Sequence, residues 1–230
     1  SILKFGNGTG LTVNGRLSAV ASVGQKILFT SYQDDNNGGD SNADGTGSVP
    51  NVGDWAGITF NTGANPASSM TRCEVRYTGY GGQGGGVSVV ACAPVLNSCE
   101  FYQNQYGIAL YDGATASITS CTMGSSTVTP IAMTLDAQPT FTSNVFSFSN
   151  NTYDAIGLFG GTMTTNGNIV QRSVSGIPNV TYVLLSPLTV PSGITLTIAA
   201  GVVIKATYGY GFTVQGTLNV NGTSTSRVYI

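Results

Sequence analysis

The sequence predicts an all-β fold in which short strands wind, coil upon coil, into a solenoid. Three observations support this prediction. No stretch rich in Ala, Leu, Glu and Lys places apolar residues at i, i+3, i+4 and i+7, so helical signals are nearly absent. Short runs of alternating apolar residues are instead separated by Gly, Asn, Asp and Ser, which is typical of strands joined by turns. The same strand pattern also returns at a nearly constant interval.

The repeating pattern is a motif with apolar residues at its first and sixth positions and Cys or Asn at its fourth. This fourth position, here called the ladder position, is occupied in turn by Cys73, Cys99, Cys121 and Asn144, and by Asn166 in a weaker copy that starts at Met163. These positions are 26, 22, 23 and 22 residues apart. A second strand follows in four of these units: Val87–Val89, Ile108–Leu110, Ile131–Met133 and Ile156–Leu158. Such a period is typical of a β-solenoid, in which each coil buries its apolar face on its neighbours. The sequence therefore predicts about ten coils in a single domain over residues 1–230.

Composition excludes several classes of protein. Only 8% of the 230 residues are charged and none is histidine, which rules out Ser-His-Asp catalysis, His metal ligands and an imidazole base. Eight scattered cations do not make the basic groove that nucleic acid requires, and no apolar run approaches the roughly 20 residues that span a bilayer. We therefore expect neither a nucleic-acid partner nor a membrane span.

The ladder position resembles the asparagine ladder of right-handed parallel β-helices, the pectate-lyase-like superfamily. In that family, stacked Asn side chains satisfy backbone groups at a tight turn. Asn144 and Asn166 match the ladder, whereas Cys73, Cys99 and Cys121 stand where Asn would. The cysteines can be read as stacked buried thiols or as a disulfide between adjacent coils. Cys92 lies off the ladder.

A longer repeat relates the two ends of the chain. Residues 2–29 align without gaps on residues 203–230 at a constant offset of 201, so that Lys4 matches Lys205 and Gly10 matches Gly211. Two similar coils within one helix would explain this match. A match over this length favours instead a piece of a longer array, or a subunit that polymerises into one.

Residues 31–54 form an acidic insertion near the N-terminus, which holds half of the ten acidic residues. Residues 40–45 match the D-x-[DN]-x-[DN]-G start of a calcium loop, whose side chains supply oxygens to Ca²⁺ around a Gly turn. The twelfth position is Asn51 rather than Glu, so this is not an EF-hand. The candidate ligands are Asp40, Asn42 and Asp44, with Asp34, Asp35 or Asp54 as additions. The alternative is a solvated, flexible insertion.

The insertion also carries the more specific resemblance. A strand over Ile27–Ser31, an Asp/Asn/Gly loop and the sequence Gly53-Asp54-Trp55-Ala56-Gly57-Ile58 resemble a module of large secreted and surface-displayed β-helix proteins of bacteria and archaea. The resemblance implies an extracellular or cell-surface location rather than an activity.

Because many β-helices cleave acidic polysaccharides, catalytic residues must also be considered. Glu74 and Glu100 occupy equivalent positions in successive coils, with Arg72 and Arg76 beside them. Stacked strands would hold these carboxylates about 5 Å apart, near the separation in retaining glycosidases. The alternative is an exposed patch of ion pairs. The His and the Arg-x-Lys motif of polygalacturonase-like enzymes are absent.

These observations lead to a main hypothesis and two alternatives. The main hypothesis is a non-enzymatic extracellular β-helix, a structural or adhesive module with structural calcium. It would stack head to tail through open coil edges, as tandem repeats of a surface protein or by self-association into a filament. The first alternative is a polysaccharide-binding or polysaccharide-degrading β-helix. The lesser alternative is an ice-binding protein that uses hydroxyl rows such as Thr195 and Thr197.

Overall fold

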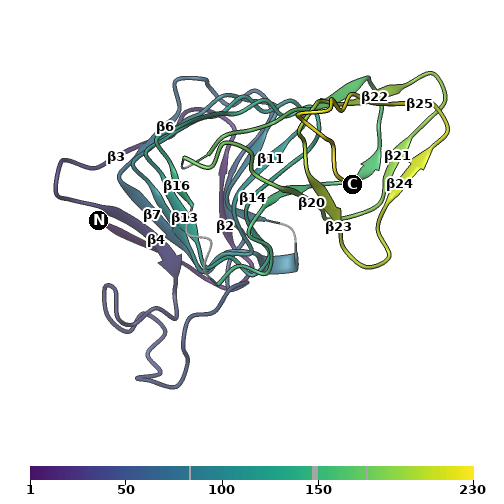
Figure 1. Cartoon of the computed structure of the whole chain (residues 1–230). Coiled ribbons are helices and arrows are strands. Elements are labelled where there is room, and N and C mark those ends of the chain that lie inside the picture. The colour runs from purple at the N-terminus through teal and green to yellow at the C-terminus, as the bar shows by residue number, and fades with distance from the viewer. Residues whose placement is uncertain (83, 147–149, 175) are drawn as a thin grey trace.

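The computed structural model describes residues 1–82, 84–146, 150–174 and 176–230 and is a parallel β-solenoid (Figure 1). Every pair of named strands is parallel, and among the described residues the only helix is a 3₁₀ turn, η1, at Tyr80–Gly82. Three sheets form the walls of the first coils. Sheet 1 contains β1 (Ile2–Phe5), β4 (Ile27–Ser31), β7 (Cys73–Arg76), β10 (Glu100–Tyr102), β13 (Thr122–Gly124) and β16 (Val145–Phe146).

Sheet 2 runs the whole length of the solenoid. It contains β2 (Gly10–Val13), β5 (Gly57–Phe60), β8 (Gly85–Val90), β11 (Tyr106–Tyr111), β14 (Thr129–Met133), β17 (Ile156–Leu158), β20 (Tyr182–Leu184) and β23 (Ile204–Ala206). Sheet 3 contains β3 (Ser18–Val20), β6 (Ser69–Thr71), β9 (Val95–Asn97), β12 (Ser117–Thr119) and β15 (Thr140–Thr142). The predicted all-β solenoid is therefore confirmed.

The molecule divides into two lobes that share sheet 2. In the N-terminal lobe, residues 1–146, each coil passes through sheets 1, 2 and 3. In the C-terminal lobe, residues 156–230, sheets 1 and 3 have ended, and each coil passes from sheet 2 to two new sheets. Sheet 4 contains β18 (Gly161–Thr162), β21 (Leu188–Val190) and β24 (Phe212–Val214), and sheet 5 contains β19 (Gly167–Ile169), β22 (Thr195–Ile198) and β25 (Thr217–Val220). Their later strands extend to one side in Figure 1.

The longest sheet has eight strands, close to the ten coils that the period predicts. The difference arises because several coils are longer than 23 residues. The longest contains the strand-free segment 32–56, which adds about one coil's length of chain without a new strand in sheet 2.

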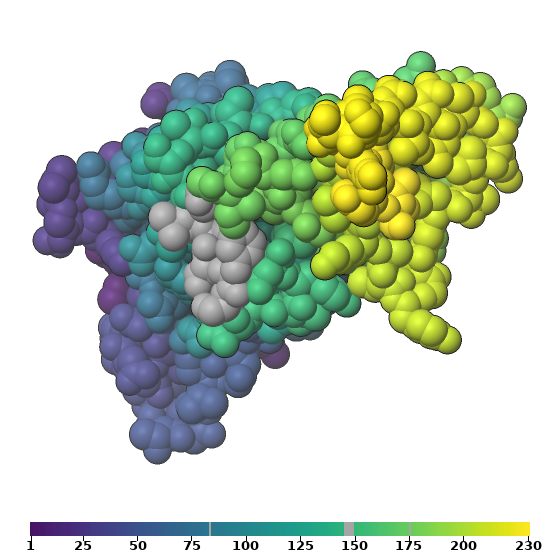
Figure 2. Space-filling model, viewed as in Figure 1, coloured from purple at the N-terminus to yellow at the C-terminus, as the bar shows by residue number. Residues whose placement is uncertain are grey.

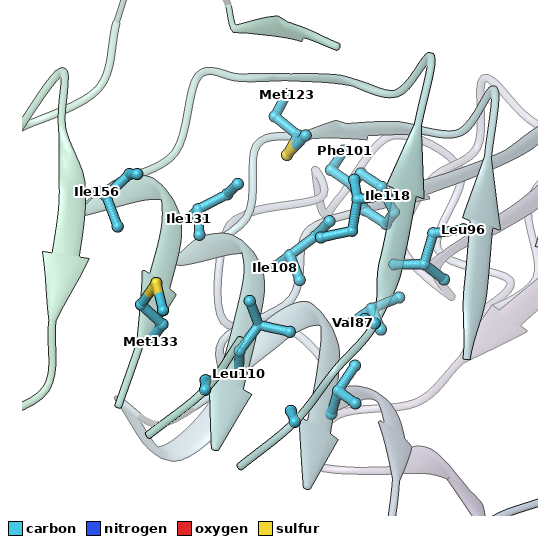
Figure 3. Close-up of a cluster of buried hydrophobic side chains, with 14 of the residues drawn as sticks. Val87, Leu96, Phe101, Ile108, Leu110, Ile118, Met123, Ile131, Met133 and Ile156 are labelled. Carbon is cyan, nitrogen blue, oxygen red and sulfur yellow. The ribbon is translucent and has the colours of Figure 1, made fainter. Parts of the chain in front are cut away.

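The core is a set of apolar rows that run along the solenoid axis (Figure 3). On sheet 2 the residues Val87, Ile108, Ile131 and Ile156 pair in register from coil to coil, and all four are fully buried. This register is the one that the four predicted second strands require. Because side chains alternate across a strand, every second residue points inward, and each fully buried aliphatic side chain contributes about 1.5–3 kcal/mol.

The ladder position lies at the corner between sheets 3 and 1. The residue before it is left-handed in four coils, with φ of 55°, 54°, 52° and 53° at Arg72, Ser98, Ser120 and Ser143. The sulfur atoms lie close to carbonyl oxygens of the preceding coil, and the pairs are Cys73–Ala19 at 3.2 Å, Cys99–Met70 at 3.4 Å and Cys121–Leu96 at 3.5 Å. All four cysteines are free, so the structure contains the stacked thiols and no disulfide.

Asn144 performs the same task with stronger bonds. Its Nδ2 donates to the Ile118 carbonyl at 2.8 Å, and its Oδ1 accepts from the Cys121 amide at 2.8 Å. Asn166 lies at the corresponding corner of the C-terminal lobe but is exposed, and its Oδ1 accepts from the Thr195 amide at 2.8 Å. The buried ladder therefore belongs to the N-terminal lobe.

A second ladder, which the sequence motif did not identify, lies at the corner between sheets 1 and 2. Its members include Thr78, Asn104 and Ser126, all fully buried. The Oδ1 atom of Asn104 accepts from the Thr78 amide at 3.1 Å, and its Nδ2 donates to the Val75 carbonyl at 2.9 Å. The residue before each member is again left-handed, as at Gln103 with φ 55°. The sequence motif did not identify this corner because its members share size and polarity but no single residue type.

The two terminal coils, residues 2–29 and 203–230, are built alike. The strands β1, β2 and β3 correspond to β23, β24 and β25 at the offset of 201. The pair Ile2–Leu28 closes the first coil, and the pair Val203–Tyr229 closes the last coil at the equivalent positions. The strands lie in different sheets, however, since β1 belongs to sheet 1 and β23 to sheet 2.

Candidate functional sites in the acidic loop, the carboxylate cluster and the terminal coils

The acidic insertion is held to the N-terminal coil at its ends and in its middle. It leaves β4 after Ser31 and returns at Trp55, whose side chain is fully buried. The Trp55 ring stacks on Phe5 with a centroid distance of 4.3 Å, and its Nε1 donates to the Arg76 carbonyl at 2.6 Å. Between these ends, the Lys4 ammonium donates to the Gly39 carbonyl. The loop projects from the body as the violet-blue lobe at the lower left of Figure 2.

Three carboxylates converge within this loop. One oxygen from each of Asp35, Asp40 and Asp44 lies within 4.8 Å of the others. Partial desolvation and then the charges of Asp40 and Asp44 raise the pKa of Asp35. Backbone amides, first that of Gly45 at 2.8 Å, lower the pKa of Asp40. Like charges this close repel each other unless a cation joins them, so the arrangement offers hard oxygen ligands of the kind that Ca²⁺ prefers.

The other three predicted ligands have different partners. The Asn42 amide donates to Asp44 at 2.8 Å, and its Oδ1, like Oδ1 of Asp35, has no hydrogen-bond partner. Asp34 is buried and accepts from the Thr30 hydroxyl at 2.7 Å, and Asp54 accepts from the Asn51 amide at 3.0 Å. Asp34 and Asp54 therefore shape the loop, while Asn42 lies beside the three converging carboxylates.

Glu74 and Glu100 pair in register on β7 and β10, as the repeat predicts. Lys26 lies between them, with its Nζ 3.4 Å from Glu74 and 2.6 Å from Glu100. Arg76 forms an ion pair with Glu74, whose side chain is only 10% exposed. Arg72 turns away, because its backbone is left-handed at the corner, and it donates to the Ala21 carbonyl at 2.8 Å.

Electrostatics make this group of residues a compensated ion-pair cluster. Burial works against the charged form of Lys26, but the hydrogen bond to Glu100 and the charge of Glu74 outweigh it and raise the pKa of Lys26. Similarly, burial opposes and the charge of Glu74 favours the cationic form of Arg76, and the net effect raises its pKa. A shallow open pocket nearby is lined by Arg76, Tyr102, Gln103, Ser125 and Asn150, so neither glutamate lines it. Lys26 could have been found from the sequence, since it directly precedes the strand that stacks on β7.

Exposed apolar side chains gather on the terminal coils. Among the described residues, fourteen large hydrophobic side chains are exposed, and ten of them lie in residues 2–29 or 203–230. These ten are Ile2, Leu3, Val20, Val23, Tyr208, Tyr210, Val214, Val220, Tyr229 and Ile230. The strands β2 and β3 at one end, and β24 and β25 at the other, each pair with a neighbour on one side only. Both terminal coils therefore combine unpaired strand edges with apolar surface.

Threonine hydroxyls, considered above for ice binding, line up in one narrow row on sheet 4 and only partly on sheet 5. Thr162, Thr189 and Thr213 pair across sheet 4 on three successive strands. On sheet 5, Thr195 pairs with Thr217, but Thr197 pairs with Asn168 and Asn219. No helix within the described part of the chain is long and apolar enough to cross a membrane.

Comparison with known proteins adds one finding to this geometry. The chain gives no match among curated proteins and none among solved structures. The model of a family described as the right handed beta helix region matches residues 41–183, which is more than half of the chain and spans the coils with both buried ladders. The parallel solenoid and this match agree, and the protein belongs to the right-handed β-helix family.

Proposed function

We propose that this protein is a non-enzymatic structural module, secreted or displayed on a cell surface, that stacks end to end on copies of itself. The observation that carries the proposal is the pair of terminal coils, which are built alike and hold most of the exposed apolar side chains. The compensated state of Glu74 and Glu100 supports a structural role over a catalytic one. The extracellular location rests on the resemblance of residues 27–58 to surface β-helix modules.

The physical reason for stacking is the open edge of a solenoid. Unpaired N–H and C=O groups of an edge strand recruit another strand, and the apolar interior of the last coil is buried only when another coil covers it. Because the two ends of the molecule are different surfaces, each contact is head to tail and leaves a free end for the next copy. Such a contact generates a linear assembly.

The mass of the protein in solution tests this proposal. We expect sedimentation velocity to show species larger than the monomer that increase with protein concentration. Val214→Glu places a charge on the C-terminal coil and should remove these species, because Val214 is 43% exposed at the proposed contact. Val95→Glu is the matched control, since Val95 is 40% exposed on β9 within the N-terminal lobe. A monomer at all concentrations, or equal effects of the two variants, would contradict the proposal.

We further propose that Ca²⁺ binds Asp35, Asp40 and Asp44 and orders the insertion. Three converging carboxylates and two acceptor oxygens without partners, on Asp35 and Asn42, support this assignment. Isothermal titration of the purified chain with CaCl₂ should show binding at about 1 mM or below, the range of extracellular calcium modules. Asp40→Asn should weaken binding, whereas Asp112→Asn, an exposed carboxylate outside the loop, should not. Absence of binding at several millimolar Ca²⁺ would refute the assignment.

A further inference from the structure

We infer that the end-to-end contact is rotated by one sheet, so that β2 and β3 of a second copy lie on β24 and β25 of the first. This inference rests on the proposed stacking and names its register. The alternative is an unrotated contact in which sheet 2 of one copy simply continues sheet 2 of the next, placing β2 on β23. Sheet membership, side-chain rows and corner lengths all distinguish the two arrangements.

Sheet membership gives the rotation directly. From β1 the chain completes seven coils, closing at β4, β7, β10, β13, β16, β19 and β22, and then advances one more sheet to β23. In the N-terminal lobe the chain passes from sheet 2 to sheet 3 and then to sheet 1. In the C-terminal lobe it passes from sheet 2 to sheet 4 and then to sheet 5, so sheets 4 and 5 take the places of sheets 3 and 1. The 201-residue repeat thus contains about seven and one-third coils, and each equivalent strand is displaced by one sheet.

An outer row of hydroxyls continues across the joint in the rotated arrangement. Thr162, Thr189 and Thr213 pair along sheet 4, and Thr12 pairs with Thr59 at the other end of the molecule. Placing β2 on β24 in the register of the repeat brings Thr12 of the second copy onto Thr213. Threonines that face each other across strands pair favourably, and the row would then pass through the contact without interruption.

Inner apolar rows continue in the same register. Val190 pairs with Val214 on sheet 4, and Val13 pairs with Phe60 on sheet 2, so Val13 of the second copy would cover Val214. On sheet 5, Ile198 pairs with Val220, which Ala19 of the second copy would cover. Val214 and Val220 are among the exposed side chains of the last coil, and this register buries both.

Corner lengths also favour the rotated arrangement. The three corners of the first coil are residues 6–9, 14–17 and 21–26, and those of the last coil are 207–211, 215–216 and 221–227. Rotated stacking places each corner on its equivalent: residues 6–9 lie on 207–211, residues 14–17 on 215–216 and residues 21–26 on 221–227. The longest corner of the first coil then lies on the longest corner of the last coil. Unrotated stacking would place the corner 21–26 on the tight corner 215–216 and the corner 6–9 on 221–227. Tyr229 already bridges to Val203 on β23, so the joint rests on β24 and β25.

A disulfide trap tests the register. The full chain carrying Thr12→Cys and Thr213→Cys should shift, on mild oxidation, from monomer to a ladder of linked species longer than dimers. The chain carrying Thr12→Cys and Lys205→Cys reports the unrotated register and should form no such ladder of linked species. Each single variant controls for symmetric contacts, which stop at dimers, and the unmodified chain controls for the native thiols.

The outcomes separate the register from the stacking itself. A ladder from the Thr12–Thr213 variant alone supports the rotated joint. Oligomers in solution together with a ladder from the Thr12–Lys205 variant, or from neither, would overturn the rotation and leave end-to-end stacking intact. Absence of both oligomers and ladders would overturn the proposed stacking as well.

Discussion

The two lobes turn the chain at their corners in different ways. In the N-terminal lobe, corners combine left-handed non-glycine residues with buried side chains that bond to the next coil, as at Ser143 and Asn144. In the C-terminal lobe, glycine brings backbones into close contact at the corners, whereas the comparable glycines of the N-terminal lobe, Gly57 and Gly107, lie within strands of sheet 2. A Cβ on Gly216 would lie 2.2 Å from the Pro191 carbonyl oxygen, and one on Gly160 would lie 2.3 Å from that of Pro187.

The corners of the two lobes are therefore stabilised by different interactions. The corners of the N-terminal lobe depend on hydrogen bonds, and its coils after the first are covered on both sides by further coils. The C-terminal lobe has three strands in each of its own two sheets, depends on close backbone contact at its corners, and leaves apolar surface on its last coil. Matched substitutions in the two lobes should therefore have unequal effects.

The largest expected effect comes from the shared sheet. Ile131 is paired with Ile108 and Ile156 on both sides, whereas Ile204 has Tyr182 as its strand partner on one side. Ile131→Ala should cost about 4 kcal/mol and Ile204→Ala about 2 kcal/mol, because the cavity in the middle of the stack is the less able to collapse. Urea unfolding measures both. Equal losses would show that position along the stack does not affect the cost.

The next effect concerns the glycine corners. Gly216→Ala should cost about 3 kcal/mol, since the new methyl group would collide with backbone oxygens that cannot easily move. Gly15→Ala is the matched control at the equivalent position of the first coil, where a Cβ meets nothing within 4 Å. That substitution should raise stability by about 0.5 kcal/mol through the unfolded chain. Thermal melting of both variants compares them, and equal melting temperatures would refute the role assigned to Gly216.

The ladder supplies a third comparison. Asn144→Ala would leave the Cys121 amide and the Ile118 carbonyl buried without partners, at a cost of about 2 kcal/mol. Asn166→Ala removes a bond at an exposed corner, where water replaces it, and should cost less than about 1 kcal/mol. Unfolding by urea should show this order. The reverse order would mean that the exposed Asn, rather than the buried one, fixes its corner.

The smallest effect belongs to the ion-pair cluster. The pKa of Lys26 is raised in the folded state, so folding favours its charged form. This contribution is present below the unfolded pKa of 10.5 and is lost as pH rises through the higher folded value. Half-exposure of the side chain limits the contribution to about 1 kcal/mol or less. Lys26→Met should be less stable than the unmodified chain at pH 8 and approach it at pH 12, and parallel pH profiles would contradict this assignment.

Much of the fold could be predicted because a solenoid repeats in sequence what it repeats in space. The regular spacing of Cys73, Cys99, Cys121 and Asn144 identified one corner, and the four predicted strands of sheet 2 pair in the expected register. The second ladder was missed because its members are Thr78, Asn104 and Ser126, which share size and polarity but no single residue type.

The candidate sites were less predictable because they join residues through the coil register. Asp40 and Asp44 follow from a local motif and converge, as the motif requires. Asp35 joins them and Asp34 does not, because Thr30 and Asn37 bind the Asp34 carboxylate. Lys26 reaches Glu74 and Glu100 only through the stacking of β4, β7 and β10.

The sequence by itself determined the period, the strand positions and the equivalence of residues 2–29 and 203–230, because apolar alternation and turn residues act locally and recur in every coil. Only the tertiary structure decided which sheet each strand enters. That choice depends on the lengths of all preceding corners, and it accumulates along the chain until β23 lies one sheet away from β1. The 201-residue repeat contains about one-third of a coil beyond seven whole coils, and no single motif shows this remainder. It nevertheless sets the rotation between one copy and the next in the proposed stack.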